Sequence, residues 1–131
     1  MNEINISLVL PVAHDQLYKM WLSSKYHTEF TGGAAKINAR AGARFTTWDG
    51  YINGKNLELI PGKFIKQTWR TAEFDLDQPD SVLELFFEEK EKGKTRLRLH
   101  HYNLTKADVM KYKKGWKEFY FAPMKIYFTT K

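Results

Sequence analysis

Alternating apolar and polar residues near the start of the chain predict a β-strand. Residues 4–10 carry isoleucine or leucine at every second position, the period of a strand with one buried face, and Pro11 ends the run. Apolar residues then recur at helical spacing. They predict a short helix over residues 14–22 and a second one, following two serines, that reaches about Phe30.

The middle of the chain is divided by turn signals and predicts further strands. These are expected over residues 43–48, 51–60, 64–74, 81–88 and 95–103. Asp49-Gly50 is typical of a type I′ turn and Pro61-Gly62 of a type II turn, and Lys92-Gly93 reverses the chain again. Consecutive turns of this kind describe an antiparallel meander.

Three of these strands have one clearly apolar face, which we expect to point inward. The inward side chains are Ile65, Gln67 and Trp69 on the first, Leu83, Leu85 and Phe87 on the second, and Leu97, Leu99 and His101 on the third. Residues 51–60 show no alternation clear enough to assign their faces.

The C-terminal region predicts one long amphipathic helix. Thr105 and Asp108 resemble a capping box at its start. Its apolar face, with spacings of three and four, holds Val109, Tyr112, Trp116, Phe119, Tyr120, Pro123 and Tyr127. Its basic face holds Lys106, Lys111, Lys113, Lys114 and Lys117. Because the Pro123 ring crowds the carbonyl of Phe119, we expect a kink there.

The order of elements predicts an α+β fold in a single domain over residues 1–131. A curved antiparallel sheet wrapped around the last helix would bury the aromatic face of that helix. A chain of 131 residues is long enough for one hydrophobic core, and it shows no repeat or linker.

Charge and composition exclude several classes of function. The net charge is +6, but the lysines are spread along the chain among acidic residues, so nucleic-acid binding is not expected. The chain has no cysteine, which removes disulfides, thiolate catalysis and cysteine-based metal sites. No secretory signal and no apolar run near the ~20 residues of a membrane span is present. We therefore expect a soluble, cytoplasmic protein.

Motifs for catalysis or cofactor binding are weak. His100 and His101 are neighbours on a strand and point to opposite faces, so no metal site is expected. No phosphate loop, dinucleotide fingerprint or serine-hydrolase motif is present, and no cofactor or catalytic residue is predicted. His101 points inward near a cavity mouth; it could contact a ligand or act as an acid or base, or simply be satisfied by a neighbour.

Aromatic residues make up 15% of the chain and are its strongest functional signal. They could line a pocket or fill a core, since both are mostly apolar. The candidate cavity residues are Trp21, Phe30, Phe45, Trp48, Gln67, Trp69, Leu85, Phe87, Leu99, His101, Tyr112, Trp116, Phe119 and Tyr120.

Several segments resemble the activator-of-heat-shock-protein-90-ATPase-like family. They are residues 42–45 (GARF), 48–54 (WDGYING), 57–61 (LELIP) and 67–70 (QTWR), with Gly115, Trp116, Tyr120, Pro123, Met124, Tyr127 and Phe128. The resemblance covers nearly the whole chain and corresponds to the C-terminal domain of the eukaryotic activator. It implies the helix-grip fold of the START/SRPBCC superfamily, in which a cavity commonly lies between sheet and helix.

Three functions follow as hypotheses. The first is a non-enzymatic binding module that holds a small apolar or aromatic molecule. The second is a co-chaperone-like protein that binds a heat-shock-protein-90-type chaperone through Lys111, Lys113, Lys114 and Lys117 and modulates its ATPase. The third is a cyclase or dehydratase that uses His101 or Tyr112. Either a monomer or a homodimer is expected.

Overall fold

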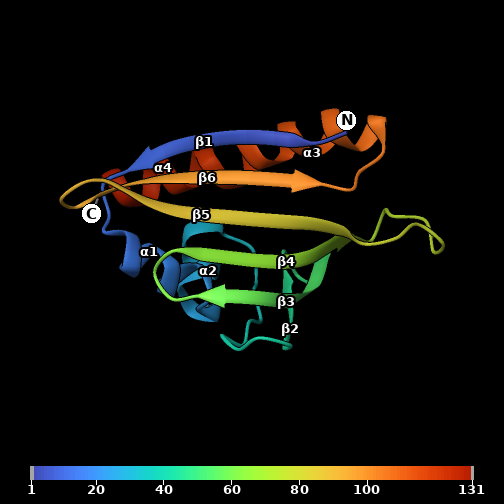
Figure 1. Cartoon of the computed structure of the whole chain (residues 1–131), viewed down its shortest axis with the longest axis horizontal. Coiled ribbons are helices and arrows are strands. Elements are labelled where there is room, and N and C mark those ends of the chain that lie inside the picture. The colour runs from blue at the N-terminus through green and yellow to red at the C-terminus, as the bar shows by residue number, and fades with distance from the viewer. Residues whose placement is uncertain (1, 131) are drawn as a thin grey trace.

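Six antiparallel strands form one sheet in the computed structural model, which describes residues 2–130 (Figure 1). The strands are β1 (Ile4–Leu10), β2 (Arg44–Thr47), β3 (Ile52–Ile60), β4 (Phe64–Thr71), β5 (Ser81–Glu91) and β6 (Lys94–Tyr102). Their order in the sheet is β1-β6-β5-β4-β3-β2. The predicted meander is therefore present, and the first strand pairs with the last, with Ile6 opposite Leu99.

The helices lie behind the sheet in the view of Figure 1. The two short ones predicted after the first strand are α1 (His14–Trp21) and α2 (Ser24–Thr31). The C-terminal ones are α3 (Lys106–Trp116), a π-helical turn η1 (Lys117–Phe121) and α4 (Ala122–Thr129). This arrangement, an antiparallel sheet with a long helical segment across one face, is the predicted helix-grip fold.

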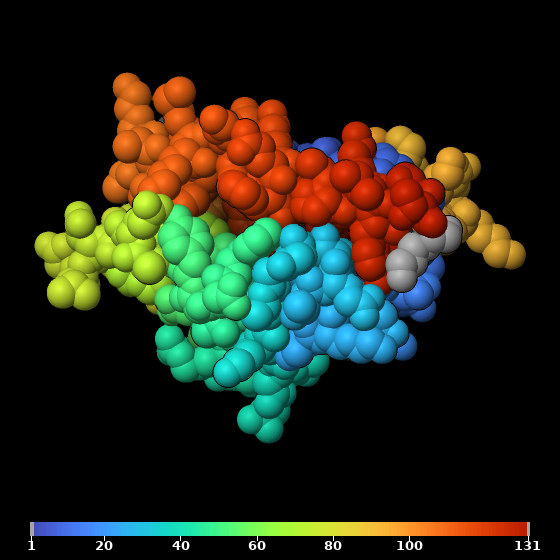
Figure 2. Space-filling view, turned by 180° about the vertical axis from the view of Figure 1, so that it is seen from behind, coloured from blue at the N-terminus to red at the C-terminus, as the bar shows by residue number. Residues whose placement is uncertain are grey.

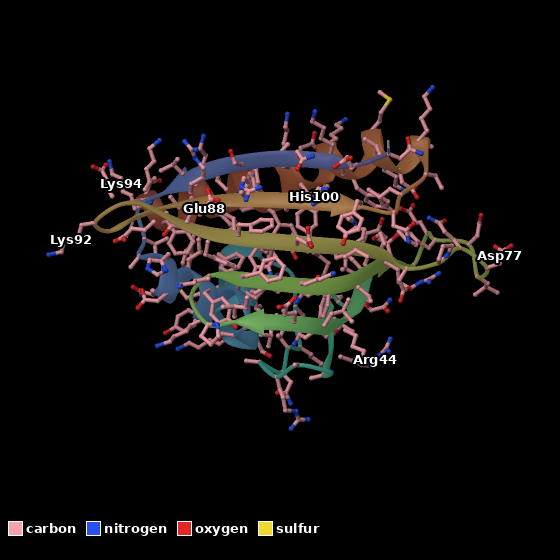
Figure 3. The ribbon with its side chains drawn as sticks, in the orientation of Figure 1. Arg44, Asp77, Glu88, Lys92, Lys94 and His100 are labelled. Carbon is pink, nitrogen blue, oxygen red and sulfur yellow. The ribbon has the colours of Figure 1, made fainter. Side chains whose placement is uncertain are left out.

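The predicted inward faces of β4, β5 and β6 are confirmed. All nine side chains assigned inward are at most 4% exposed, including Gln67 and His101. The opposite face carries charged groups, and Figure 3 shows Glu88 on β5 and His100 on β6 there. Because strand neighbours point to opposite sides, the alternation alone separates the core from the solvent face.

An irregularity in strand β3 is the reason why its sequence shows no clear alternation. Its first half alternates, with Ile52 and Asn56 buried, but the register with β4 shifts between Asn56 and Glu58. Leu57 lies within this irregularity and is exposed, although it is apolar, and the alternation breaks at Glu58, which is also exposed. A bulge breaks the period of two, so the hydrophobic pattern on its own could not report which side faces the core.

The loop between β2 and β3 is longer than predicted. Positive φ angles at Asp49 and Gly50 agree with the expected turn, but β2 ends at Thr47, and Trp48 also has a positive φ of 52°. The result is a four-residue loop over residues 48–51, closed by the pairing of Thr47 with Ile52. A bulky residue rarely adopts positive φ, and this conformation holds the Trp48 ring beside the C-terminal helices.

The long C-terminal helix is interrupted just before Pro123. The interruption is the π-helical turn η1, which includes Phe119 and in which the Ala122 N–H reaches the Lys117 carbonyl. Pro123 has no N–H, and a wider turn ahead of it relieves the crowding of its ring against the preceding carbonyl. At the other end, Thr105 accepts from the Asp108 N–H at 3.1 Å. The Asp108 carboxylate instead accepts from Gln78, so only half of the capping box forms.

Candidate functional site

A half-open pocket of about 430 Å³ lies between α3, η1 and the β2–β3 loop. Its walls are Trp48, Tyr51, Ile52, Trp69, Lys111, Tyr112, Gly115, Trp116, Phe119 and Tyr120. Figure 2 shows this side of the molecule, with the helices in orange to red beside the green loop. The volume lies within the range of ~300–1,000 Å³ that small-molecule sites occupy.

Two glycines create the room for this pocket. Gly115 lies on α3, and a Cβ built there would meet nothing within 4 Å, so the helix leaves open space at this position. Gly33 has a different role: its missing side chain lets the Trp48 ring come close, because a Cβ there would lie 2.4 Å from that ring. Trp48 then packs edge-to-face on Phe119, with ring centroids 5.7 Å apart. The opening is thus bounded by an aromatic pair that depends on Gly33.

Trp116 forms the centre of the aromatic floor. Its ring lies 4.7 Å from that of Tyr120 and 5.7 Å from that of Trp69, and it is 3% exposed. Trp116 comes from the end of α3 and Tyr120 from η1, so the π-helical turn determines how these two rings meet. Such turns often occur where a helix carries a functional side chain.

His101 is buried behind this floor and does not line the pocket. Its Nδ1 accepts a hydrogen bond from Trp116 Nε1 at 3.0 Å, so its Nε2 carries the proton and donates to Ser81 Oγ at 2.8 Å. Ser81 Oγ in turn donates to the Trp69 carbonyl. Burial lowers the pKa of His101 to about 3, which keeps the ring neutral. His101 therefore orients Trp116, and its predicted position near the mouth is wrong.

A second buried histidine, His27, was not among the predicted site residues. Its Nδ1–H donates to the Trp21 carbonyl at 2.8 Å, which leaves Nε2 to accept from the Tyr120 hydroxyl, also at 2.8 Å. Burial lowers the pKa of His27 to about 4 and raises the pKa of Tyr120. The sequence feature that indicates a buried His27 is its helical spacing with Phe30 and Thr31, since all three are buried on α2.

The mouth of the pocket carries its polar groups. The Tyr51 hydroxyl and the Lys111 ammonium both donate to one carboxylate oxygen, Oε1 of Glu73. The Lys111 ion pair and the Tyr51 hydroxyl lower the pKa of Glu73, and the same carboxylate raises the pKa of Lys111. Burial and the bond to Glu73 raise the pKa of Tyr51. The Glu73–Tyr51–Lys111 cluster is therefore ionised as a carboxylate and an ammonium at neutral pH.

The structure brings together only part of the predicted site. Six of the candidates line the pocket: Trp48, Trp69, Tyr112, Trp116, Phe119 and Tyr120. Trp21, Phe45 and Gln67 surround a separate small void of about 10 Å³. Phe30, Leu85, Phe87 and Leu99 belong to the filled core. Four other pocket residues were not predicted, because the faces of residues 51–60 were unassigned and Lys111 was placed on the basic face: Tyr51, Ile52, Lys111 and Gly115.

The pocket offers binding groups rather than a metal site. Within residues 2–130, no group of three or more His, Cys, Asp or Glu side chains could hold a metal ion. The same part of the chain has no helix with the length and apolar character needed to cross a bilayer. The aromatic walls can hold the apolar part of a small molecule, and the groups at the mouth can hold its polar end.

Known proteins with similar sequences are activators of a chaperone ATPase. The chain is 25% identical over 111 residues to human "Activator of 90 kDa heat shock protein ATPase homolog 1", and the mouse homologue gives the same values. That match covers 85% of this chain but only 32% of the human protein. The chain therefore spans about a third of the length of these curated relatives.

Solved structures of similar fold include a Plasmodium falciparum Hsp90 activator, with a TM-score of 0.86 at 19% identity over 96% of this chain and 95% of that one. The Aha1 dimer of Colwellia psychrerythraea has a TM-score of 0.77 at 17% identity, covering 93% and 92%. These likenesses support the helix-grip fold. The model of the family described as "Activator of Hsp90 ATPase homolog 1-like protein" matches residues 11–129, and the chain belongs to that family.

Proposed function

We propose that this chain is a chaperone-binding module that modulates the ATPase of a heat-shock-protein-90-type chaperone. The observation that carries the proposal is the family match over residues 11–129, together with curated relatives named as activators of that ATPase. The sequence alone favoured the ligand-binding module over this function, and the relatives favour this function. A cytoplasmic location stays a prediction that fits this function.

The exposed side of α3 and η1 is the proposed docking surface. Lys113 and Lys117 are exposed there, and within the described part of the chain neither forms an ion pair. Lys114 is exposed but lies 3.8 Å from Glu118. Lys111, also predicted for this surface, instead binds Glu73 at the pocket mouth. The docking surface is thus reduced to Lys113, Lys114 and Lys117, which would attract an acidic partner surface.

Affinity for a purified heat-shock-protein-90-type chaperone from the same organism tests this function. The double variant Lys113→Glu/Lys117→Glu should bind about tenfold more weakly and lose most of its salt dependence, because rim charges steer association. The matched control is Lys90→Glu/Lys92→Glu, which makes the same charge change at the β5–β6 turn, at the opposite end of the molecule from α3 (Figures 1 and 3). Equal effects of both double variants, or no binding at low salt, would contradict the proposal.

A second candidate function is the binding of a small apolar or aromatic molecule. It is favoured by one observation, the half-open aromatic pocket of about 430 Å³. The neutral fluorescent probe N-phenyl-1-naphthylamine should bind to the wild-type protein. Gly115→Leu should abolish that binding, because a Cβ at this position meets nothing within 4 Å and the rest of the leucine side chain would occupy space in the pocket. Probe binding that survives this substitution would place the probe elsewhere.

The two functions are compatible on one molecule. The pocket opens between α3 and the β2–β3 loop, and the docking lysines lie on the exposed side of α3 and η1. The Colwellia relative is a dimer. The oligomeric state of this chain alone should therefore be measured by sedimentation before the stoichiometry of a chaperone complex is determined. Monomer and homodimer both remain predictions for it.

A further inference from the structure

Apart from the Trp48 indole N–H, the polar side-chain atoms of the pocket walls fall into two groups. Those deep in the walls are occupied within the protein, since Trp116 Nε1 donates to His101, Tyr120 Oη donates to His27, and Tyr112 Oη bonds Thr71 at 2.7 Å. Those at the mouth, on Tyr51 and Lys111, bond a side chain that lies outside the walls. The Trp48 indole N–H has no hydrogen-bond partner within residues 2–130 but is buried, so the polar side-chain atoms that a ligand in the pocket can reach are those at the mouth.

The two donors at the mouth converge on one point. The Tyr51 hydroxyl comes from the end of the β2–β3 loop and the Lys111 ammonium from α3, yet both reach the same oxygen of Glu73. Glu73 lies in the loop after β4, at the edge of the opening. Its carboxylate shows which ligand group these donors suit, because a hydroxyl and an ammonium that share one oxygen form a site for an anion.

Glu73 can be replaced by another carboxylate at small cost. The Glu73 and Lys111 side chains are 51% and 47% exposed, and ion pairs with this exposure contribute little to stability because water competes for both partners. Lys111 is also the one charged side chain in the described pocket wall. A ligand carboxylate that displaces Glu73 would thus meet a cation and a hydroxyl donor that are already positioned.

We infer that the pocket binds an amphipathic acid, with an apolar ring or chain against Trp69 and Trp116 and a carboxylate at the mouth held by Lys111 and Tyr51. This inference rests on the proposed ligand-binding function of the pocket and specifies its ligand class. Glu73 then acts as an internal competitor that occupies the carboxylate position when no ligand is bound. The apolar walls select ligands by the shape of their apolar part, and the mouth selects them by the charge of their polar end.

A matched pair of competitors tests the charge preference. 2-Naphthoate and 2-naphthamide have the same ring system and nearly the same size, but only the naphthoate is an anion at pH 7. Each is titrated against bound N-phenyl-1-naphthylamine at low salt. The wild-type protein should bind the naphthoate about tenfold more tightly than the amide, as expected for a charge-assisted pair of hydrogen bonds at a partly exposed site.

Two variants assign that preference to the mouth. Lys111→Met should lower naphthoate affinity about tenfold and leave naphthamide affinity unchanged. Glu73→Gln should raise naphthoate affinity severalfold, because it removes the competing and repelling negative charge, and should also leave the amide unchanged. The matched control is Glu88→Gln, which neutralises the carboxylate of an equally exposed ion pair with Arg98 on the outer face of the sheet.

The outcomes separate this inference from the function on which it rests. Equal displacement by the two competitors in the wild type, or an equal loss for both in Lys111→Met, would overturn the anion preference while leaving an apolar pocket. No binding of the neutral probe to the wild type would overturn the pocket function and this inference together. An increase in naphthoate affinity in Glu88→Gln matching that in Glu73→Gln would attribute the effect to net charge and overturn the role of the mouth.

Discussion

The contact between the sheet and the C-terminal helices has a closed region and an open region. In the closed region, Trp21 and His27 pack against Tyr120, and Phe30 packs against both of them. All three, from α1 and α2, are at most 3% exposed. In the open region, Trp48 and Phe119 pack edge-to-face in the wall of the pocket, and Phe119 is 54% exposed. Both regions are built from aromatic rings, so residue type does not explain why one is filled and the other is hollow.

The difference comes from what covers each region. Two helices cover the closed region, and their histidine, hydroxyl and carbonyl groups satisfy one another. A four-residue loop covers the open region, and Gly115 presents no side chain to it. Within residues 2–130, the Trp48 indole N–H is buried without a hydrogen-bond partner. Buried polar atoms are nearly always paired, so this unpaired donor distinguishes the open region from the closed one.

The largest effect is expected at Trp116, which belongs to both regions. Trp116→Ala should destabilise the fold by about 3–5 kcal/mol, because it leaves a large cavity and removes the donor to His101 Nδ1. Phe119→Ala is the matched comparison, since Phe119 lines the same pocket but is half exposed. It should cost less than about 1 kcal/mol. Urea denaturation of both variants measures the two losses in free energy of unfolding. Losses of similar size would mean that the open region is also part of the core.

Acid should weaken the closed region. Burial lowers the pKa of His27 to about 4 and that of His101 to about 3, whereas an unfolded chain binds these protons near pH 6.5. Between about pH 6 and pH 4 the unfolded state therefore binds more protons than the folded state. Stability falls as the pH is lowered, by up to about 1.4 kcal/mol per pH unit for each histidine.

Urea denaturation at pH 7, 5.5 and 4.5 measures this loss. His27→Gln should give a shallower pH dependence than the wild type, because it removes one of the two titrating groups. A free energy of unfolding that stays constant over this pH range would show that neither histidine is held neutral by the fold.

A smaller destabilisation is expected at Gly33, on the border between the regions. Gly33→Ala would place a Cβ 2.4 Å from the Trp48 ring, so the ring must move. We expect a loss of about 1–3 kcal/mol, typical of overpacking, and weaker binding of N-phenyl-1-naphthylamine. Unchanged stability with unchanged probe affinity would mean that the position of Trp48 does not shape the pocket.

The smallest effect, with the opposite sign, is expected at Gly115. Gly115→Ala should stabilise the protein by about 0.5–1 kcal/mol, because alanine is favoured over glycine within a helix and its methyl group enters open space. Thermal unfolding measures the gain. Destabilisation by this methyl group would show that the space beside Gly115 is filled in solution, and the open region would then resemble the closed one.

The elements and faces that depend on local order were predictable. Alternation placed Leu97, Leu99 and His101 inward, and the capping residue Thr105 marked the start of α3. The bulge in β3 and the π-helical turn before Pro123 were not predicted, because both are departures from the regular periods on which such inference relies. The π-helical turn determines where Phe119 and Tyr120 lie, and both line the pocket.

The sequence by itself determined the fold class, the inward faces of three strands and an aromatic content of 15%. Only the tertiary structure decided which of those residues fill the core and which line a pocket. The physical reason is that this choice depends on contacts between distant positions, such as His27 with Tyr120 and Glu73 with Lys111. Hydrophobic period reports which side of an element is buried, but the neighbour that covers it comes from elsewhere in the chain.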